Sequence, residues 1–285
     1  LNGTYVLPLS VNYRGIFYNK RMLEEDGYQI PSTYAELIDT MQQIKKAGKL
    51  PIIFADKDSW TIHQGWDAID MSSRGSQDDF FQNVLNGDAF LYEDSIALDS
   101  TRKFLEIRKY GQKQTVNTGY DEAVKKFANG EAYMFFQGNW AYPMIKKINP
   151  DIDLLFMPFP AYHENQAKVV VKIDATLGVS ASCKHLEAVE QFLDYVFSKN
   201  VSEYYADKAG AYSCIKSVDV EDSYAKAFTD SIRSGEFFLE EFAYETEKSD
   251  AINALFQNFI SSPQRDTEKS FLKELNDLLI QQKGD

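Results

Sequence analysis

The chain has 285 residues, of which 44% are hydrophobic and 26% charged, and its formal net charge is −13. This length accommodates two lobes or one large α/β domain, and the negative charge argues against nucleic acid as a partner because phosphates would be repelled. No apolar run reaches the roughly 18 residues that a membrane-spanning helix needs.

Strand and helix signals alternate over the first two thirds of the chain. A strand is expected over residues 11–18, a helix over 34–47 that begins at a capping box of Thr33 and Glu36, and a buried strand over 51–54. This order reads as a β-α-β unit. Further strands are expected over 3–8, 132–136, 153–157, 168–173 and 176–181, and further helices over 21–27, 61–70, 99–110, 120–127, 140–148, 186–197, 201–208, 221–234, 247–260 and 267–282. The pattern predicts an α/β fold with a mostly parallel sheet.

The strand that ends near Gly138 is followed by Trp140, where a helix is expected to begin. Ligands bind at strand ends in open α/β folds, and an indole offers a flat apolar face with a polar edge. We therefore predict that Trp140 forms the floor of a small-molecule cleft. The alternative is a core tryptophan that fills the corner between strand and helix.

A second aromatic residue, Trp60, lies in a polar loop beside Asp58. A carboxylate next to an indole suits a ligand rich in hydroxyl groups, so both residues are candidate ligand contacts. Trp66 lies on an expected helix, where packing in the core is the favoured interpretation.

Cysteine and histidine spacing indicates neither a metal site nor a cofactor. Cys183 and Cys214 form no metal motif; they could pair in a disulfide, but two separate thiols packed as small hydrophobic groups are favoured. His63, His163 and His185 are scattered, and His163 and His185 are expected at the surface. We expect no metal, no cofactor and no catalytic residue.

Several motifs in chain order resemble the extracellular solute-binding proteins of carbohydrate ABC transporters, the maltose-binding-like group (family 1). The match is collinear over essentially the whole chain, and the motifs are specific in combination. They are Tyr5-Val-Leu-Pro8, Gly15-Ile-Phe-Tyr-Asn-Lys20, Pro31-Ser-Thr-Tyr-Ala-Glu-Leu37, Gly48-Lys-Leu-Pro-Ile52, Phe127-Ala-Asn-Gly-Glu-Ala-Tyr-Met134, Gly138-Asn-Trp140 and Leu177-Gly-Val-Ser-Ala-Ser182 with the helix that follows it.

The resemblance implies a periplasmic-binding-protein-like (type II) two-lobe fold with a hinge. It also implies that the chain lacks roughly the first hundred residues of the group, so that the N-terminal lobe is incomplete. The expected domains are residues 1–8 and 178–222 as the remnant of the N-terminal lobe, 9–12 and 171–177 as hinge crossings, and 13–170 with 224–285 as the C-terminal lobe.

The function implied by the resemblance is a monomeric receptor that captures a sugar or oligosaccharide between its lobes and delivers it to the permease subunits of an ABC importer. Its location would be extracellular, anchored as a lipoprotein, or periplasmic, with signal and anchor outside this chain. The alternatives are a glycosidase that uses paired carboxylates and the ligand-sensing domain of a signalling receptor. No catalytic motif fixes an acid and a base.

The resemblance also extends the candidate ligand site. Asn12 stands at a hinge position where relatives carry a sugar-contacting polar residue, and Arg14 shares its strand face. Arg14 could contact an acidic ligand group or pair with Asp174. For Lys172 and Asp174 two alternatives are expected: they form a salt bridge with each other across the hinge, or they contact the ligand. Tyr244 stands near the place where relatives offer a further aromatic platform.

Overall fold

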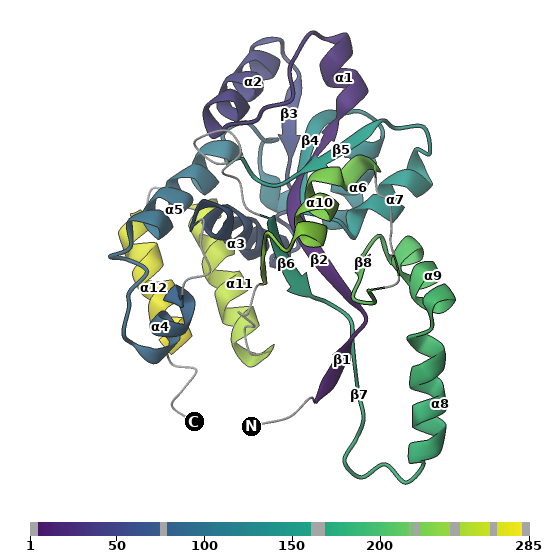
Figure 1. Ribbon diagram of the computed structural model, residues 1–285. Helices are drawn as coiled ribbons and strands as arrows, with labels where there is room; N and C mark the ends of the chain where they lie inside the picture. Colours follow the sequence, from purple (N-terminus) through teal and green to yellow (C-terminus); the bar gives the residue numbers. More distant parts are fainter. Residues whose placement is uncertain are drawn as a thin grey trace.

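The computed structural model describes the chain in seven stretches (Figure 1). They are residues 5–74, 79–160, 169–216, 218, 223–239, 246–262 and 267–280. The site residue predicted at Tyr244 and the predicted surface residue His163 lie outside these ranges.

The main sheet is organised around one long strand, β2 (Ser10–Asn19), which is buried along nearly its whole length. Within the described stretches, four strands pair with β2, all of them antiparallel. They are β4 (Ala132–Gly138), β5 (Leu154–Met157), β6 (Val169–Ile173) and β8 (Tyr212–Ser213). Two more strands extend the sheet with parallel pairing, β3 (Leu50–Ile53) beside β4 and β9 (Phe237–Leu239) beside β6.

The prediction of a mostly parallel sheet is therefore wrong, although the α/β class is confirmed. In the predicted β-α-β unit, β3 runs antiparallel to β2 and is separated from it by β4. The connection contains two helices, α1 (Lys20–Glu25) and α2 (Tyr34–Lys46), close to the ranges 21–27 and 34–47 that the sequence predicts. A connection with two helices can return the chain in either direction, so the order of elements does not determine how the strands run.

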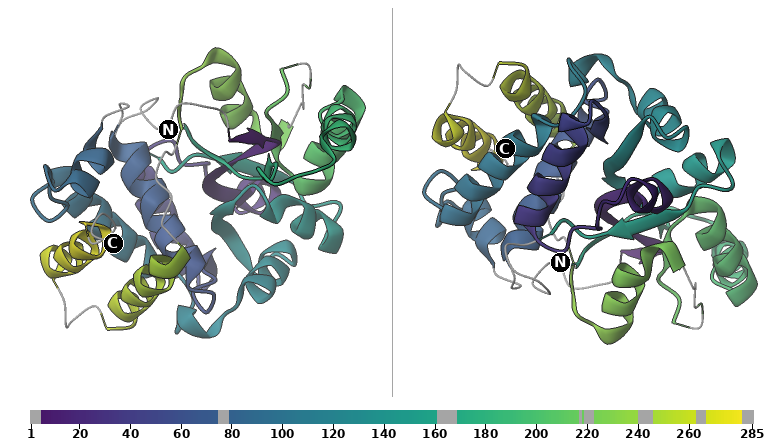
Figure 2. Two further views of the ribbon diagram at one scale, coloured as in Figure 1. Left: turned by 90° about the horizontal axis from the view of Figure 1, so that it is seen from below. Right: turned by 90° about the horizontal axis from the view of Figure 1, so that it is seen from above.

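Alternate side chains of β2 enter two cores on opposite faces of the sheet, as the pleat requires. Ile16 and Tyr18 belong to one core, and Tyr13 and Phe17 to the other. Figure 2 shows the helices on both sides. The first core is covered by α2, α3 (Trp60–Arg74), α4 (Phe80–Asn86), α5 (Ser95–Arg108), α11 (Thr246–Ser261) and α12 (Glu268–Ile280), and the second by α6 (Tyr120–Ala128), α7 (Ala141–Ile148) and α10 (Lys226–Ser234).

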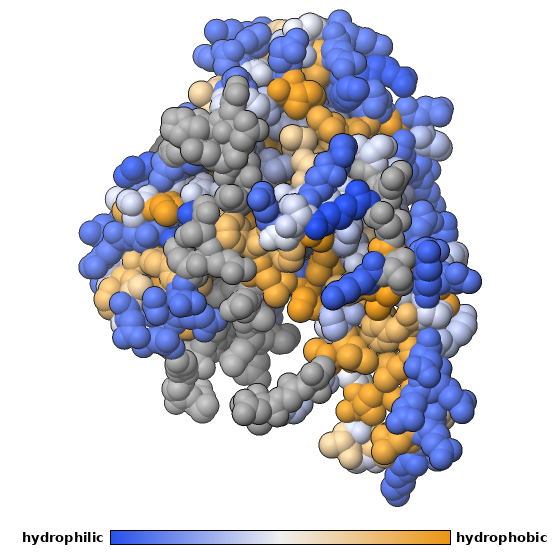
Figure 3. Space-filling model, in the orientation of Figure 1, coloured by the Kyte–Doolittle hydropathy of each residue, from blue (hydrophilic) through white to orange (hydrophobic). Residues whose placement is uncertain are grey.

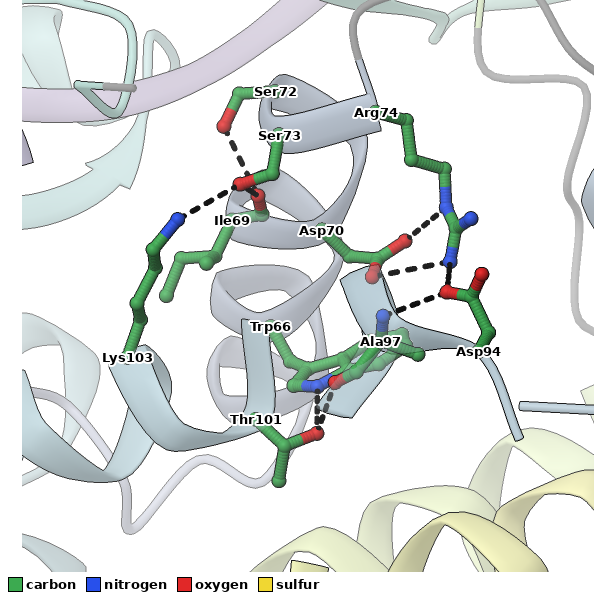
Figure 4. A network of polar contacts seen from close by, with 10 residues as sticks. All are labelled: Trp66, Ile69, Asp70, Ser72, Ser73, Arg74, Asp94, Ala97, Thr101 and Lys103. Atoms are coloured by element: carbon green, nitrogen blue, oxygen red, sulfur yellow. Dashed lines mark hydrogen bonds and ion pairs between the residues drawn. The ribbon is translucent and has the colours of Figure 1, made fainter. Parts of the chain in front are cut away.

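Helix α3 is held in place by a buried network of polar contacts (Figure 4). Arg74 donates to Asp70 at 2.6 Å and to Asp94 at 2.8 Å, and Asp94 also caps the N-terminus of α5. The Trp66 indole N–H donates to Thr101 Oγ1 at 3.0 Å, and Trp66 is 1% exposed, which confirms its assignment to the core. These contacts fix α3 against α5 and so position the residues at the beginning of α3.

A separate antiparallel pair joins β1 (Val6–Pro8) to β7 (Thr176–Gly178), and α8 (Leu186–Val196) and α9 (Lys199–Ala209) lie on the same side of the molecule (Figure 1). Helix α8 buries none of its residues. Apolar side chains gather on this part of the surface (Figure 3).

Cys183 and Cys214 are both free thiols, so the favoured interpretation of two separate cysteines is confirmed. His185 is exposed, as expected. Within the described stretches, no helix has the length and apolarity needed to cross a membrane, and no three His, Cys, Asp or Glu side chains gather where they could hold a metal ion.

Candidate functional site

A pocket of about 510 Å³ opens where β2, the end of β4, the beginning of α3 and the end of β6 meet. Six of the eight residues predicted to bind ligand line it. The lining consists of Asn12, Arg14, Trp60, Gln64, Trp140, Lys172, Ile173 and Asp174. Of the other two, Asp58 is not among the lining residues, and Tyr244 lies outside the described residues. The structure thus brings together residues that are up to 162 positions apart, from Asn12 to Asp174.

Two half-buried indoles form the aromatic part of the pocket. Trp140 directly precedes α7, Trp60 is the first residue of α3, and their ring centroids are 6.2 Å apart with an angle of 51° between the planes. Trp60 also packs against Tyr120, at 5.3 Å between centroids. Tilted rings at this separation support each other and leave apolar area for a ligand.

The position of the Trp140 indole depends on Gly138, the last residue of β4. A β-carbon built on Gly138 would lie 2.1 Å from Cη2 and Cζ3 of the indole. Any side chain at position 138 would collide with the ring. The glycine therefore allows the indole to fold back over the end of the strand.

Arg14 is buried, 7% exposed, and it contacts α3. Its Nη1 lies 3.5 Å from Asp67 Oδ2 and donates to the backbone carbonyl of Gln64 at 3.3 Å. The sequence left open whether Arg14 contacts an acidic ligand group or pairs with Asp174, and the ion pair seen here is with Asp67 on α3. A buried guanidinium next to a buried carboxylate offsets much of the cost of desolvating both.

Lys172 and Asp174 lie at the end of β6, opposite the N-terminal part of β2. Lys172 is half-buried, and burial lowers the pKa of its ammonium group; the charge of Arg14 lowers it further, while Asp67 and Asp174 oppose the shift. Asp174 is exposed, and its backbone N–H donates to the carbonyl of Ser10 at 3.0 Å. The pocket therefore combines cationic and anionic groups with two aromatic faces.

Helix α3 also carries a row of polar residues that were not predicted as part of the site. His63, Gln64 and Asp67 follow Trp60 at offsets of three, four and seven, so helical periodicity places them on the same side as Trp60. Nδ1 of His63 lies 2.6 Å from Oδ1 of Asn253, and burial lowers the pKa of the imidazole, against the opposing charge of Asp67. The spacing from Trp60 was the signal that could have identified these residues.

Asp58 has a structural contact next to the pocket. Its Oδ2 accepts the backbone N–H of Tyr120 at 2.6 Å, at the N-terminus of α6, where Gly119 has no side chain that could cap the helix. A carboxylate at this position also suits the helix dipole. A role for Asp58 in ligand binding stays a prediction.

The chain belongs to a family of binding proteins. Residues 1–202 match the family described as bacterial extracellular solute-binding protein. The chain is 29% identical to a multiple sugar-binding protein of Streptococcus mutans over 222 residues, which are 75% of this chain and 52% of that protein. It is 20% identical to the melibiose/raffinose/stachyose-binding protein MelE of Bacillus subtilis, over 79% of this chain and 54% of that protein. The chain thus spans about half the length of the curated relatives that it matches.

Solved structures of the same kind share the fold. The solute-binding protein RafE in complex with raffinose matches with a TM-score of 0.82 and 23% identity, over 98% of this chain and 73% of that one. A chitin oligosaccharide binding protein matches with a TM-score of 0.80 and 20% identity, over 98% and 72% of the two chains. These similarities confirm the type II periplasmic-binding-protein-like fold expected from the sequence. The names of the relatives describe binding proteins, not enzymes.

Proposed function

We propose that this chain forms one wall of a sugar-binding cleft in a receptor that captures an oligosaccharide outside the cell and passes it, chemically unchanged, to an ABC importer. The observation that carries the proposal is the pairing of Trp60 and Trp140 in one pocket with Asn12, Lys172 and Asp174. Indole faces stack on the C–H face of a sugar ring, and amide, ammonium and carboxylate groups bond to its hydroxyls.

A hinge beside the pocket would couple binding to closure of two lobes. The expected crossings, residues 9–12 and 171–177, lie side by side, and Asn12 is the direct antiparallel partner of Lys172. Both side chains line the pocket, so a bound sugar would bridge the crossings. In this proposal residues 1–8 and 178–222 belong to the second lobe, and residues 13–170 with 224–285 to the lobe that carries the indoles. Bending at such crossings closes two lobes around a ligand.

The partners and the location follow from the family and belong to the same proposal. The closed, sugar-loaded receptor would act as a monomer and dock on the permease subunits of the importer. It would work at the cell surface, held by a lipid anchor, or in the periplasm. This role requires no metal, no cofactor and no catalytic group.

The sugar to test first is suggested by the relatives named for raffinose, stachyose and melibiose. The experiment is calorimetric titration of the receptor with both walls of the cleft against these three sugars and maltose, with chromatography of the sugar afterwards. We expect at least one sugar to bind and to be recovered intact. Absence of binding across the panel would refute the proposal, and hydrolysis of the sugar would indicate an enzyme instead.

Substitution of one indole then tests the site. Trp140→Ala should weaken binding by at least about 1 kcal/mol, because an aromatic anchor is lost. The matched control is Tyr195→Ala on α8, which removes a 65% exposed aromatic ring that does not line the pocket and should leave the affinity unchanged. If the Trp140→Ala variant and the unmodified chain bind sugar with equal affinity, Trp140 does not contribute to sugar binding.

A further inference from the structure

Asn139, between Gly138 and Trp140, is completely buried and connects three parts of the fold. Its Oδ1 accepts the backbone N–H of Tyr13 on β2 at 2.8 Å. Its Nδ2 donates to the side-chain Oδ1 of Asn12 at 3.2 Å and to the backbone carbonyl of Gly210, which follows α9. One side chain thus joins β2, the start of α7 and the end of α9.

The polarity of these bonds determines how Asn12 is oriented. A backbone N–H can only donate, so the Asn139 atom that faces Tyr13 must be the oxygen. The other terminal atom of Asn139 is then the amide nitrogen, which can only donate. The Asn12 atom that faces it must therefore be the carbonyl oxygen. Because Oδ1 of Asn12 faces Asn139, the N–H₂ group is the other end of this amide, in a residue that lines the pocket.

Asn139 itself is held rigidly. Its backbone N–H donates to the carbonyl of Tyr13 at 3.1 Å. Gly210 has a positive φ of 61°, and a β-carbon there would lie 2.7 Å from Cδ of Pro143 on α7, so the end of α9 packs closely against α7. This close packing places the Gly210 carbonyl at Asn139. A side chain with bonds to three elements cannot turn without breaking several of them at once.

We propose that Asn139 is a positioning residue that fixes the amide of Asn12, so that the pocket presents N–H donors at this point and receives an acceptor oxygen of the sugar. The proposal rests on the proposed function and deepens it, because it assigns a hydrogen-bond polarity to one wall of the pocket. It also explains the buried asparagine between Gly138 and Trp140, a position that a hydrophobic residue would fill if only packing mattered.

A double-mutant cycle tests whether Asn139 acts through Asn12. Asn12→Ala, Asn139→Ala and the double variant are titrated with raffinose, and their thermal unfolding is measured without sugar. We expect each single variant to bind about fivefold more weakly, the effect of one lost hydrogen bond, and the double variant to bind no more weakly than Asn12→Ala. The lower stability caused by Asn139→Ala should persist in both backgrounds.

The matched control is Asn276→Ala. Asn276 on α12 is also completely buried, and its Oδ1 also accepts a backbone N–H, that of Leu91 at 2.9 Å. This variant should lose stability as Asn139→Ala does, but keep its affinity for raffinose. The positioning role is refuted if Asn139→Ala weakens raffinose binding equally in the unmodified chain and in the Asn12→Ala variant. It is also refuted if Asn139→Ala does not weaken binding at all.

A measurement without sugar keeps the inference separate from the proposed function. The side-chain amide of Asn12 is observed by heteronuclear NMR in the unmodified chain and in the Asn139→Ala variant. We expect an ordered Asn12 amide in the former and a mobile one in the latter. An equally ordered amide in both refutes the role of Asn139. Failure of raffinose to bind, with the loss of order observed, would contradict the choice of ligand and leave the positioning confirmed.

Discussion

The indole of Trp140 occupies the space that a side chain at Gly138 would fill, with two ring carbons 2.1 Å from the position of a Gly138 β-carbon. The two residues form one local arrangement at the end of β4. The absence of a side chain at one position determines where the aromatic face of the other lies. The glycine is therefore as necessary to the pocket as the tryptophan.

Gly138→Ala should displace the indole. The ring lies at the end of a side chain and can turn away from the new methyl group, so we expect a stability loss of about 1 kcal/mol, at the low end for overpacking. The affinity for sugar should fall about as much as in Trp140→Ala. Titration and urea unfolding of both variants check this.

Gly65→Ala is the matched control for that experiment. A β-carbon at Gly65 would lie 3.7 Å from the nearest atom, an ordinary contact, and Gly65 lies inside α3. Alanine favours a helix interior by roughly 0.5–1 kcal/mol, so this variant should be as stable or more stable, with unchanged affinity. If Gly138→Ala binds sugar as tightly as Gly65→Ala does, the indole of Trp140 does not depend on the glycine at position 138.

Tryptophan fluorescence should report on the pocket directly, because the chain has 3 tryptophans and two of them line it. Trp66→Phe should preserve the change in emission on sugar binding and lower the free energy of unfolding by about 1 kcal/mol, since the bond to Thr101 is lost. Trp60→Phe and Trp140→Phe should each remove a large part of the change. A sugar response that disappears in Trp66→Phe would place the responding indole in the core.

The buried contact between Arg14 and Asp67 should contribute to stability. Asp67→Ala removes a carboxylate that is 2% exposed, and we expect the free energy of unfolding to fall by about 3 kcal/mol, as it does when one partner of a buried ion pair is removed. The control is Asp230→Ala, whose exposed pair with Lys226 should contribute less than about 1 kcal/mol. Urea unfolding measures both, and equal losses would contradict the prediction.

Asp70 should make the folded chain less stable as the pH rises, whereas a carboxylate with a lowered pKa makes it more stable. Burial raises the pKa of its carboxyl from 3.8 to about 6, although Arg74 opposes the shift. Between these values the folded chain binds a proton that the unfolded chain has lost. The contribution of Asp70 to the free energy of unfolding is thus fully present below about pH 4 and is lost as the pH rises through about 6.

The comparison of the chain with Asp70→Asn isolates this effect from the other acids. The difference in free energy of unfolding between the two should change by up to about 3 kcal/mol from pH 4 to pH 7, with the unmodified chain losing stability relative to the variant. Urea unfolding at a series of pH values measures it. Parallel stability curves for the two proteins would show that the pKa of Asp70 is not raised.

Local signals were sufficient to predict most elements. The capping box of Thr33 and Glu36 is present, and α2 begins at Tyr34 as expected. Such a box is formed by side chains three residues apart, so its residues carry all the information needed. The indole at the end of β4 was predicted for the same reason, because strand, glycine and tryptophan follow one another in the chain.

Partners far apart in the chain could not be predicted in this way. Asp67 lies 53 residues from Arg14, and Asn253 lies 190 residues from His63. The sequence contains many acids and amides that could fill these roles. Which of them meets Arg14 or His63 depends on how α3 and α11 pack, and periodicity along one helix carries no information about the distance to another.

The sequence by itself determined most of the elements, the family resemblance and the aromatic corner, because each depends on residues that are neighbours along the chain. Tertiary structure decided the antiparallel directions around β2, the pairing of Arg14 with Asp67, and the orientation of Asn12 by Asn139, 127 residues away. These features depend on hydrogen bonds and ion pairs between separate elements. Their partners are selected by the packing of the whole sheet and its helices.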